Sequence, residues 1–337
     1  MMTLFGDPTV WLPNAFAVLL GVSILAYVIL DGFDLGVGIL SPLAEGGHRD
    51  RMVASIGPFW DANETWLVLA VGILLVAFPA AHGAILTALY LPVAVMLVGL
   101  ILRGVAFEFR AKAPGHHKAR WDQAFFVGSL MTALSQGFML GLYVMGLEGG
   151  VPAILFACLT AIGVAAGYAF IGSLWLVAKT EGDLQARARA WAMATIGVVA
   201  TGLAGISVAS PLVSARVAER WFSFPEFLWL APLPLAAAAL LAGLWWSLHR
   251  LDLTNDRAAW LPFTMGSGLF CVTFAGLAYS FFPYVVPERM TIYESASSPE
   301  ALLIIFVGTC FVLPVIVGYT VLAYVIFRGK AGELRYD

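Results

Sequence analysis

Charged side chains are scarce in this chain of 337 residues. Asp, Glu, Lys and Arg make up 12% of the sequence, whereas 61% of the residues are hydrophobic. Soluble domains carry about 25% charged residues, so this composition excludes an ordinary soluble fold and predicts an all-α polytopic membrane protein. The sequence has no basic patch interleaved with aromatic residues, which argues against nucleic-acid binding. We expect residues 1–337 to form one integral membrane domain.

Cysteine and histidine are also rare. Cys158, Cys271 and Cys310 lie in apolar runs without a CxxC spacing, so neither a disulfide nor a zinc site is indicated. The histidines all fall in connections or near the ends of apolar runs: His48, His82, His116, His117 and His249. A membrane heme usually takes axial ligands from helix interiors. We therefore expect no heme and no metal to be bound by this chain's own ligands.

Nine apolar segments are long enough to cross a hydrocarbon core, which takes about 20 helical residues. They are residues 14–40, 53–80, 83–109, 122–147, 151–178, 190–213, 226–249, 259–283 and 300–328. We expect two four-helix bundles and one peripheral helix. The second segment is the least obvious, because its purely apolar part from Trp66 to Phe78 is short. It spans only if it starts before Asp61, which places polar groups inside the membrane.

The basic residues predict the orientation of these segments. With nine spans, 15 of the 18 Lys and Arg residues fall on one side, and Arg216, Arg220 and Arg289 fall on the other. Connections rich in Lys and Arg stay in the cytoplasm. We therefore expect the amino terminus outside and the carboxyl terminus inside.

Two carboxylates interrupt the end of the first span. Asp31 and Asp34 are three residues apart, so they share one face of a helix. An ionisable residue in a spanning segment is costly and is a functional candidate by default. Gly32 and Gly36 are four residues apart, a spacing that lets another helix approach closely.

Further polar residues lie near the inner ends of the second and third spans: Asp61, Asn63, Glu64, Arg103 and Glu108. At about 1.5 Å per helical residue, three consecutive antiparallel helices place these groups at a similar depth, so we expect one cluster. A dry site cannot hold several unpaired carboxylates. Arg103 should therefore pair with one acid, and at least one other acid should be protonated or reached by water. The cluster either conducts protons or ties three helices together, and the residues alone leave both readings open.

At these residues the sequence resembles a known family. The stretches Asp31–Gly38 and Trp60–Trp66 resemble the two signature stretches of subunit II of the cytochrome bd-type quinol oxidases. The resemblance extends to residues 102–103, 107–110, 282–287 and 295–298.

The resemblance implies a heterodimer of two similar nine-helix subunits in a bacterial cytoplasmic (inner) membrane. Subunit I carries two hemes b, one heme d and the quinol site. The complex oxidises quinol and reduces oxygen to water, with protons taken from the inside. Subunit II carries no heme and supports subunit I. In some members it holds a structural quinone or contributes to a proton or oxygen path, and a small accessory subunit is a possible further partner.

The resemblance also implies roles for single residues. Asp61 matches the family acid placed near a proton path at the subunit interface, and Trp60 and Trp66 match its flanking aromatics. Buried polar residues of the family are matched by Asp31, Asp34 and Arg103. Glu64 stands where many members have Gln, so the hydrogen-bond network does not transfer directly. The short link between spans six and seven resembles the cyanide-insensitive branch, which leaves open whether heme d is replaced by heme b.

A proton-coupled secondary transporter is the alternative function, because buried acids also suit proton coupling. Transporters often show broken helices at corresponding positions of two repeats, whereas the charges here crowd into the first three spans. A third hypothesis is a purely structural partner subunit, which differs from the oxidase subunit II described above only in whether the acids move protons.

Overall fold

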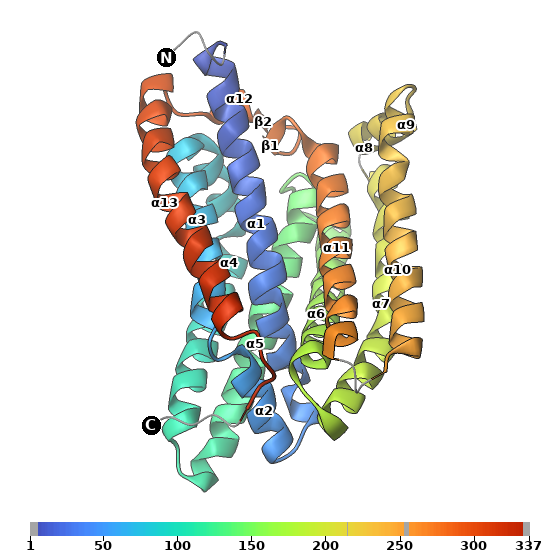
Figure 1. The fold of residues 1–337 in the computed structure, drawn as a ribbon. Coiled ribbons are helices and arrows are strands. Elements are labelled where there is room, and N and C mark those ends of the chain that lie inside the picture. The colour runs from blue at the N-terminus through green and yellow to red at the C-terminus, as the bar shows by residue number, and fades with distance from the viewer. Residues whose placement is uncertain (1–5, 214, 253–255, 333–337) are drawn as a thin grey trace.

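The computed structural model describes residues 6–213, 215–252 and 256–332. The helices are α1 (Pro8–Leu40), α2 (Gly47–Ile56), α3 (Trp60–Ala77), α4 (Pro79–Lys112), α5 (Gly115–Val144), α6 (Val151–Lys179), α7 (Gly182–Val213), α8 (Ala215–Phe222), α9 (Glu226–Leu230), α10 (Pro232–Arg250), α11 (Asp256–Phe281), α12 (Ile292–Ser295) and α13 (Pro299–Ile326). The smaller elements are the 3-10 turn η1 (Ser41–Leu43) and the strands β1 (Tyr284–Val286) and β2 (Met290–Thr291). Within the described ranges nine helical segments are long and apolar enough to cross a membrane, which confirms the predicted all-α, nine-span architecture (Figure 1).

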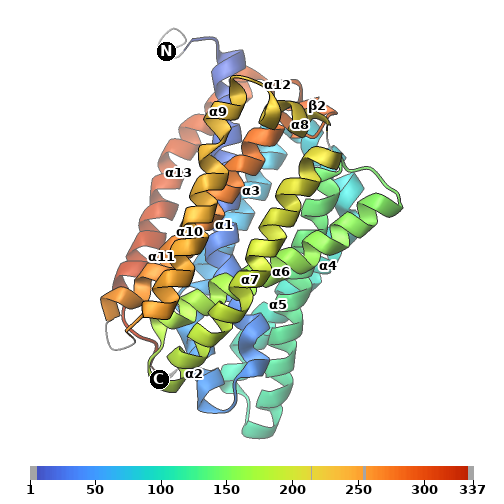
Figure 2. The same cartoon turned by 90° about the vertical axis from the view of Figure 1, so that its right-hand side faces the viewer.

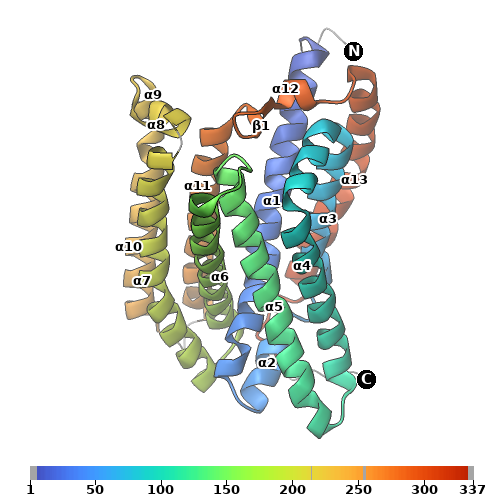
Figure 3. The same cartoon turned by 180° about the vertical axis from the view of Figure 1, so that it is seen from behind.

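The spanning helices form two groups of four. In the first, α1 contacts α3 and α5, and α4 contacts both α3 and α5, so the contacts close a ring. In the second, α6, α7, α10 and α11 close a similar ring, which Figure 2 shows from its outer side. Helix α6 also contacts α1 and α5 and joins the two groups. Helix α13 packs on α1 and α3 at the edge of the molecule, far from α7 and α10 (Figure 3). The predicted two four-helix groups and peripheral helix are thus present.

The second span begins later than the sequence analysis predicts. Residues 47–56 form the separate helix α2, and α3 begins only at Trp60. Pro58 lies between them and lacks the N–H that a continuous helix needs. The 18 residues of α3 extend about 27 Å. The prediction that Asp61 lies well inside a longer span was therefore wrong, because this residue belongs to the first turn of α3.

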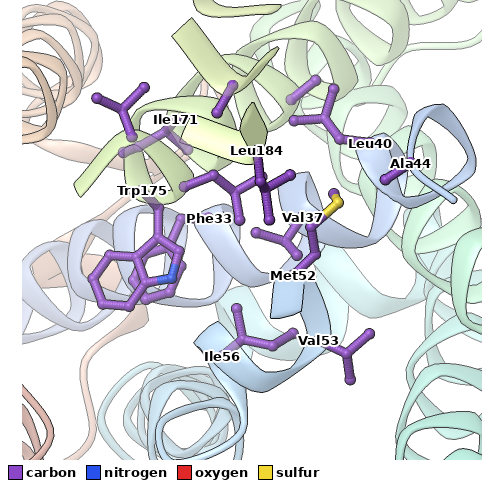
Figure 4. Packing of buried hydrophobic residues seen from close by; sticks show 14 of the residues in the cluster. Phe33, Val37, Leu40, Ala44, Met52, Val53, Ile56, Ile171, Trp175 and Leu184 are labelled. Atoms are coloured by element: carbon purple, nitrogen blue, oxygen red, sulfur yellow. The ribbon is translucent and has the colours of Figure 1, made fainter. Parts of the chain in front are cut away.

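Glycines allow α1 and α6 to touch backbone to backbone. A Cβ atom at Gly36 would meet the carbonyl oxygen of Tyr168 and the Cα of Gly172, and one at Gly32 would meet the Tyr168 ring. The close helix approach predicted from the glycine spacing is therefore confirmed. Beside this crossing lies the largest apolar core, where Phe33 stacks on Trp175 with ring centroids 4.0 Å apart (Figure 4).

The link before α13 is ordered by short-range hydrogen bonds. Strands β1 and β2 pair antiparallel, with Tyr284 opposite Thr291. Thr291 and Glu294 then form a reciprocal capping box that starts α12. Farther along, the N–H of Ser297 donates to the carbonyl oxygen of Ala77 at 2.9 Å, so the link is fastened to the end of α3.

At the opposite end, ion pairs fasten α2 to α4 and α5. Asp122 accepts hydrogen bonds from Arg49 at 2.9 Å and from Arg110 at 2.5 Å. Asp50 accepts from Arg110 at 2.7 Å and from Lys118 at 2.8 Å. Because Arg110 bridges both acids, the five side chains form one network across three helices.

This network predicts a pH-dependent contribution from Asp50. Partial burial raises the pKa of this carboxyl, but hydrogen bonds from Lys118 and Arg110 outweigh burial and bring the pKa below its ordinary value of 3.8. A carboxyl with a lowered pKa in the folded protein stabilises the fold above its unfolded-state pKa, and this stabilisation is lost as the pH falls through the folded-state value. The Asp50 side chain is 40% exposed, so we expect less than about 1 kcal/mol.

The measurement compares thermal unfolding of the native protein and Asp50→Asn from about pH 6 to about pH 3. The native protein should have the higher Tm at pH 6, and the difference should shrink as the solution becomes acidic. Asp183→Asn, at an exposed position of α7, serves as the control and should show no such convergence. A constant difference across the range would contradict this role of Asp50.

Candidate functional site

Three helices bring five polar side chains together inside the first four-helix group. Asp31 and Asp34 come from α1, Asn63 and Glu64 from α3, and Arg103 from α4. We call these five residues the polar cluster. Asp31, Asp34 and Asn63 are fully buried, Arg103 is 2% exposed, and the Glu64 side chain is 28% exposed. Glu64 is therefore the member that reaches the surface of this chain.

Arg103 binds two acids of the cluster. One terminal nitrogen, Nη1, donates to Oδ1 of Asp31 at 2.5 Å, and the other, Nη2, donates to Oε2 of Glu64 at 2.9 Å. The prediction that Arg103 pairs with a single acid was therefore wrong. The guanidinium has two separate terminal donors, which lets it join α1 and α3 through one side chain.

Asp34 has no cation of its own in the cluster and is held by an amide instead. Nδ2 of Asn63 donates to Oδ2 of Asp34 at 2.8 Å and to the carbonyl oxygen of Leu30 at 3.2 Å. The hydroxyl of Tyr324 on α13 donates to Oδ1 of Asn63 at 3.0 Å. Tyr324 was not predicted, because an isolated Tyr near the end of an apolar span is typical of an interfacial anchor.

Several polar atoms of the cluster have no hydrogen-bond partner among the described residues. They are Oδ2 of Asp31, Oδ1 of Asp34 and Nε of Arg103. Burying an ionised carboxylate without partners is costly. This geometry supports the view that not every acid of the cluster is ionised, which stays a prediction.

A second buried polar chain lies beside the cluster and was not predicted. Tyr168 donates its hydroxyl hydrogen to Oε1 of Gln136 at 2.6 Å, and Nε2 of Gln136 donates to the hydroxyl oxygen of Tyr27 at 2.5 Å. Tyr27 lies one helical turn before Asp31 on α1. This chain extends the polar interior from α1 to α5 and α6. The sequence signal that could have predicted these bonds is the amide of Gln136 within an apolar run.

Asp61 and Glu108 lie outside the polar cluster, contrary to the expectation of one buried group. Both are exposed at the surface of this chain. Successive helical residues are about 100° apart, so Asp61, two residues before the inward-facing Asn63, points away from Asn63 and lies on the exposed side of the face that carries Glu64. Glu108, five residues after Arg103, likewise faces away from the cluster on α4.

The two aromatic residues expected at an interface occupy different environments. Trp60 is partly buried, and its ring lies 5.9 Å from the guanidinium carbon of Arg103 and 5.2 Å from the ring of Phe107. Trp66 is only 6% exposed and forms part of the core. The expectation that Trp66 presents its ring to a partner is therefore not met, whereas Trp60 covers the cluster from its exposed side.

This arrangement can hold a positive charge against several acids and connect them to the surface through Glu64. In the described ranges no group of three or more His, Cys, Asp or Glu side chains is arranged to hold a metal ion. The chemistry available to these side chains is proton binding, proton exchange and electrostatic support of a neighbouring subunit.

Comparisons with known proteins agree with this picture. The family model described as cytochrome bd terminal oxidase subunit II matches residues 12–327. Cytochrome bd ubiquinol oxidase subunit 2 of Bacillus subtilis (strain 168) is 27% identical over 345 residues, covering 96% of this chain and 97% of the relative. Cytochrome bd-I ubiquinol oxidase subunit 2 of Escherichia coli (strain K12) is 28% identical, covering 91% of each chain.

A solved structure supports the fold independently. A chain in the structure of bd oxidase from Geobacillus thermodenitrificans superposes with a TM-score of 0.68 at 19% identity, covering 95% of this chain and all of the other. At this identity the likeness concerns the fold alone. The family model, however, covers nearly the whole sequence, and the chain belongs to the cytochrome bd terminal oxidase subunit II family.

Proposed function

We propose that this chain is the heme-free subunit II of a quinol oxidase in a bacterial cytoplasmic membrane. Its partner is a heme-bearing subunit I, and the complex oxidises quinol, reduces oxygen to water and takes protons from the cytoplasm. The relatives are subunits of ubiquinol oxidases, and membership of their family supports this proposal. The side rich in Lys and Arg is the cytoplasmic side in this scheme.

The observation that carries a proton role is the continuity of acids from the surface to the buried cluster. Asp61 is exposed, and Glu64 lies one turn further on the same face of α3. Glu64 is bound to Arg103, which is bound to the fully buried Asp31. We propose that Asp61 receives protons and that Glu64 connects it to the buried acids. All of these groups are side chains that accept and release protons.

The exposed carboxylates also support a position for the partner. Asp61 and Glu108 lie on neighbouring helices near the same end of apolar spans. Charged side chains that face hydrocarbon are strongly disfavoured. We propose that subunit I covers this part of α3 and α4, so that the two carboxylates face protein or water.

The positions of the histidines support placing the hemes in the partner. His82 lies in the first turns of α4, His249 in the last turn of α10, and His48 in the short helix α2. Axial ligation by two histidines needs side chains that face each other from helix interiors. These residues do not fit a bis-histidine heme.

The proposal predicts that Asp61→Asn lowers quinol oxidase turnover while the hemes remain bound. The amide keeps the size of the side chain but cannot carry a proton, and loss of a proton-transfer group typically costs about 100-fold or more. The measurement is oxygen consumption by the purified two-subunit complex, with heme content from reduced-minus-oxidised spectra. Glu108→Gln, which changes an exposed carboxyl outside the proposed path, is the matched control.

Two outcomes would count against this proposal. Normal turnover of an intact Asp61→Asn complex would remove Asp61 from the proton path. Loss of heme from the variant would point to a structural role. The transporter alternative is not favoured by the family match, and solute uptake by this chain alone in liposomes would be needed to revive it.

A further inference from the structure

Lys179, the last residue of α6, is a buried lysine that holds the segment following α13. The residue is 3% exposed, and Nζ donates to the carbonyl oxygens of Phe327 at 2.5 Å and Gly329 at 2.7 Å. The N–H of Ala331 in turn donates to the carbonyl oxygen of Lys179 at 2.7 Å. We call Lys179 and residues 327–331 the C-terminal clamp.

Aromatic rings complete the surroundings of the Lys179 ammonium group. Its Nζ lies 5.1 Å from the ring centroid of Phe59, 5.3 Å from that of Trp175 and 5.9 Å from that of Trp260. Ring faces within about 6 Å stabilise a cation, and do so most strongly away from water. A neutral side chain of the same length would still pack on the rings but would lose the cation–π attraction and the two hydrogen bonds.

The clamp lies within one helical turn of Tyr324. Phe327, whose carbonyl oxygen binds Lys179, follows Tyr324 by three residues, and the ring of Tyr324 lies 4.6 Å from the ring of Phe59. Phe59 therefore touches both the Lys179 ammonium group and Tyr324. A displacement of the clamp would be passed on to Tyr324 through the chain and through this ring.

In the described part of the chain, few residues along α13 are buried against the rest of the fold. Of the nine spans it is the least buried, with 6% of its most apolar window inside the protein. The buried residues of α13 are only Leu302, Thr320 and Ala323. A helix with so few buried residues depends on the attachments at its ends. Next to Tyr324 these are the Lys179 contacts and a hydrogen bond from Nζ of Lys330 to the carbonyl oxygen of Thr180 at 3.1 Å.

Tyr324 in turn satisfies the side-chain carbonyl oxygen of Asn63. Both contacts of Asn63 Nδ2, to Asp34 and to the Leu30 carbonyl, are acceptors, so the NH2 group must point at them. The hydroxyl of Tyr324 is the donor that satisfies Oδ1 on the other side of the amide. Without it Asn63 would bury an acceptor with no partner, a state that is disfavoured.

We infer that Lys179 is a positioning residue for the polar cluster: by clamping residues 327–331 it keeps Tyr324 bonded to Asn63 and the Asn63 amide bonded to Asp34. Lys179 touches neither Asp34 nor any proposed substrate. The effect on turnover rests on the proposed function, whereas the effect on the clamp itself does not.

The test uses the two-subunit complex and two readouts. Lys179→Met should raise hydrogen exchange in residues 327–331 on the order of tenfold or more, because each lost buried contact is worth about that factor. Lys179→Met should also shift the pH profile of quinol oxidation, and Tyr324→Phe should give the same shift.

The variant that combines Lys179→Met with Tyr324→Phe should show no further shift of the pH profile, because both changes act through one contact. Lys112→Met, at an exposed position in the last turn of α4, is the control and should leave both readouts unchanged.

The pH profile reports on Asp34 within a crowded set of groups. The titratable groups around it are Asp31 on its own helix, Glu64 on α3 and Tyr324 on α13, with the Arg103 cation on α4. Lys179→Arg keeps a cation and its donors and should restore the native profile. If the pH profile of Lys179→Met changed only because packing was lost, Lys179→Arg would not restore the native profile.

Two results would overturn the inference. If hydrogen exchange of residues 327–331 is unchanged in Lys179→Met, Lys179 does not hold this segment. If exchange is faster but the pH profile is native, holding the segment has no effect on Asp34. Should Lys179→Met fail to assemble, Tyr324→Phe alone decides, because it keeps the ring on Phe59 and a native profile would contradict the inference. Native turnover of Asp34→Asn would count against the proposed proton path. Faster hydrogen exchange of residues 327–331 in Lys179→Met would still show that Lys179 holds this segment.

Discussion

Replacing Arg103 with methionine should destabilise the protein by about 3–5 kcal/mol, the usual cost of removing one partner of a buried ion pair. Arg103 is the cation for both the fully buried Asp31 and the partly exposed Glu64. Its removal leaves a carboxylate inside the first helix group with no opposite charge. Methionine fills much of the same volume, so the loss of stability would come mainly from the missing charge.

Thermal unfolding of the purified complex, followed by tryptophan fluorescence, measures this effect. Arg120→Met, at an exposed position of α5, removes an arginine without uncovering a buried acid and should change the Tm little. Arg103→Met combined with Asp31→Asn should recover part of the loss, because the fully buried carboxylate that Arg103 binds is then replaced by a neutral amide. An Arg103→Met complex as stable as the native one would show that the buried acids need no cation.

Among the glycines whose surroundings the structure describes, Gly36 should be the one where an added methyl group does most damage. The added Cβ would meet the backbone of α6 at the Tyr168 carbonyl and the Gly172 Cα. Backbone atoms cannot rotate away as a side chain does, so the two helices must separate. Overpacking of this kind costs about 1–3 kcal/mol and occasionally more, and it would also disturb the bond from Tyr168 to Gln136.

A glycine elsewhere on α6 provides the matched control. A Cβ at Gly163 would have nothing within 4 Å, and alanine in a helix interior is favoured over glycine by about 1 kcal/mol. Gly163→Ala should therefore keep or raise the Tm while Gly36→Ala lowers it. Equal effects of the two changes would mean that the crossing of α1 and α6 is not as close as described.

Sequence patterns predicted the features that depend on local spacing. Hydrophobic runs predicted the nine spans, and the i, i+3 spacing placed Asp31 and Asp34 on the face that meets Arg103. The glycine spacing predicted the close crossing of α1. Each of these follows from the helical period and from the cost of burying charge.

The remaining features depend on which helices become neighbours, and local spacing does not contain that information. Tyr324 reaches Asn63 across 261 positions of the chain, and Gln136 reaches Tyr27 across 109. The position of Asp61 in the first turn of α3 follows from where the helix begins, which Pro58 sets and the apolar pattern did not show. The roles of Asp61 and Glu64 in proton transfer, and the branch of the family, stay predictions.

The order of residues along the chain has a consequence for biosynthesis. Asp31, Asp34 and Glu64 all precede Arg103, which follows Asp31 by 72 positions. The acids of α1 and α3 are thus made before the cation that neutralises them. An acid inside a span opposes membrane insertion, by up to about 2.5–3.5 kcal/mol for Asp at the helix centre and by less toward the ends. Helix α3 is also the least hydropathic of the nine spans. We expect α1 and α3 to settle in the bilayer only when α4 arrives, so that the first three spans insert as a unit.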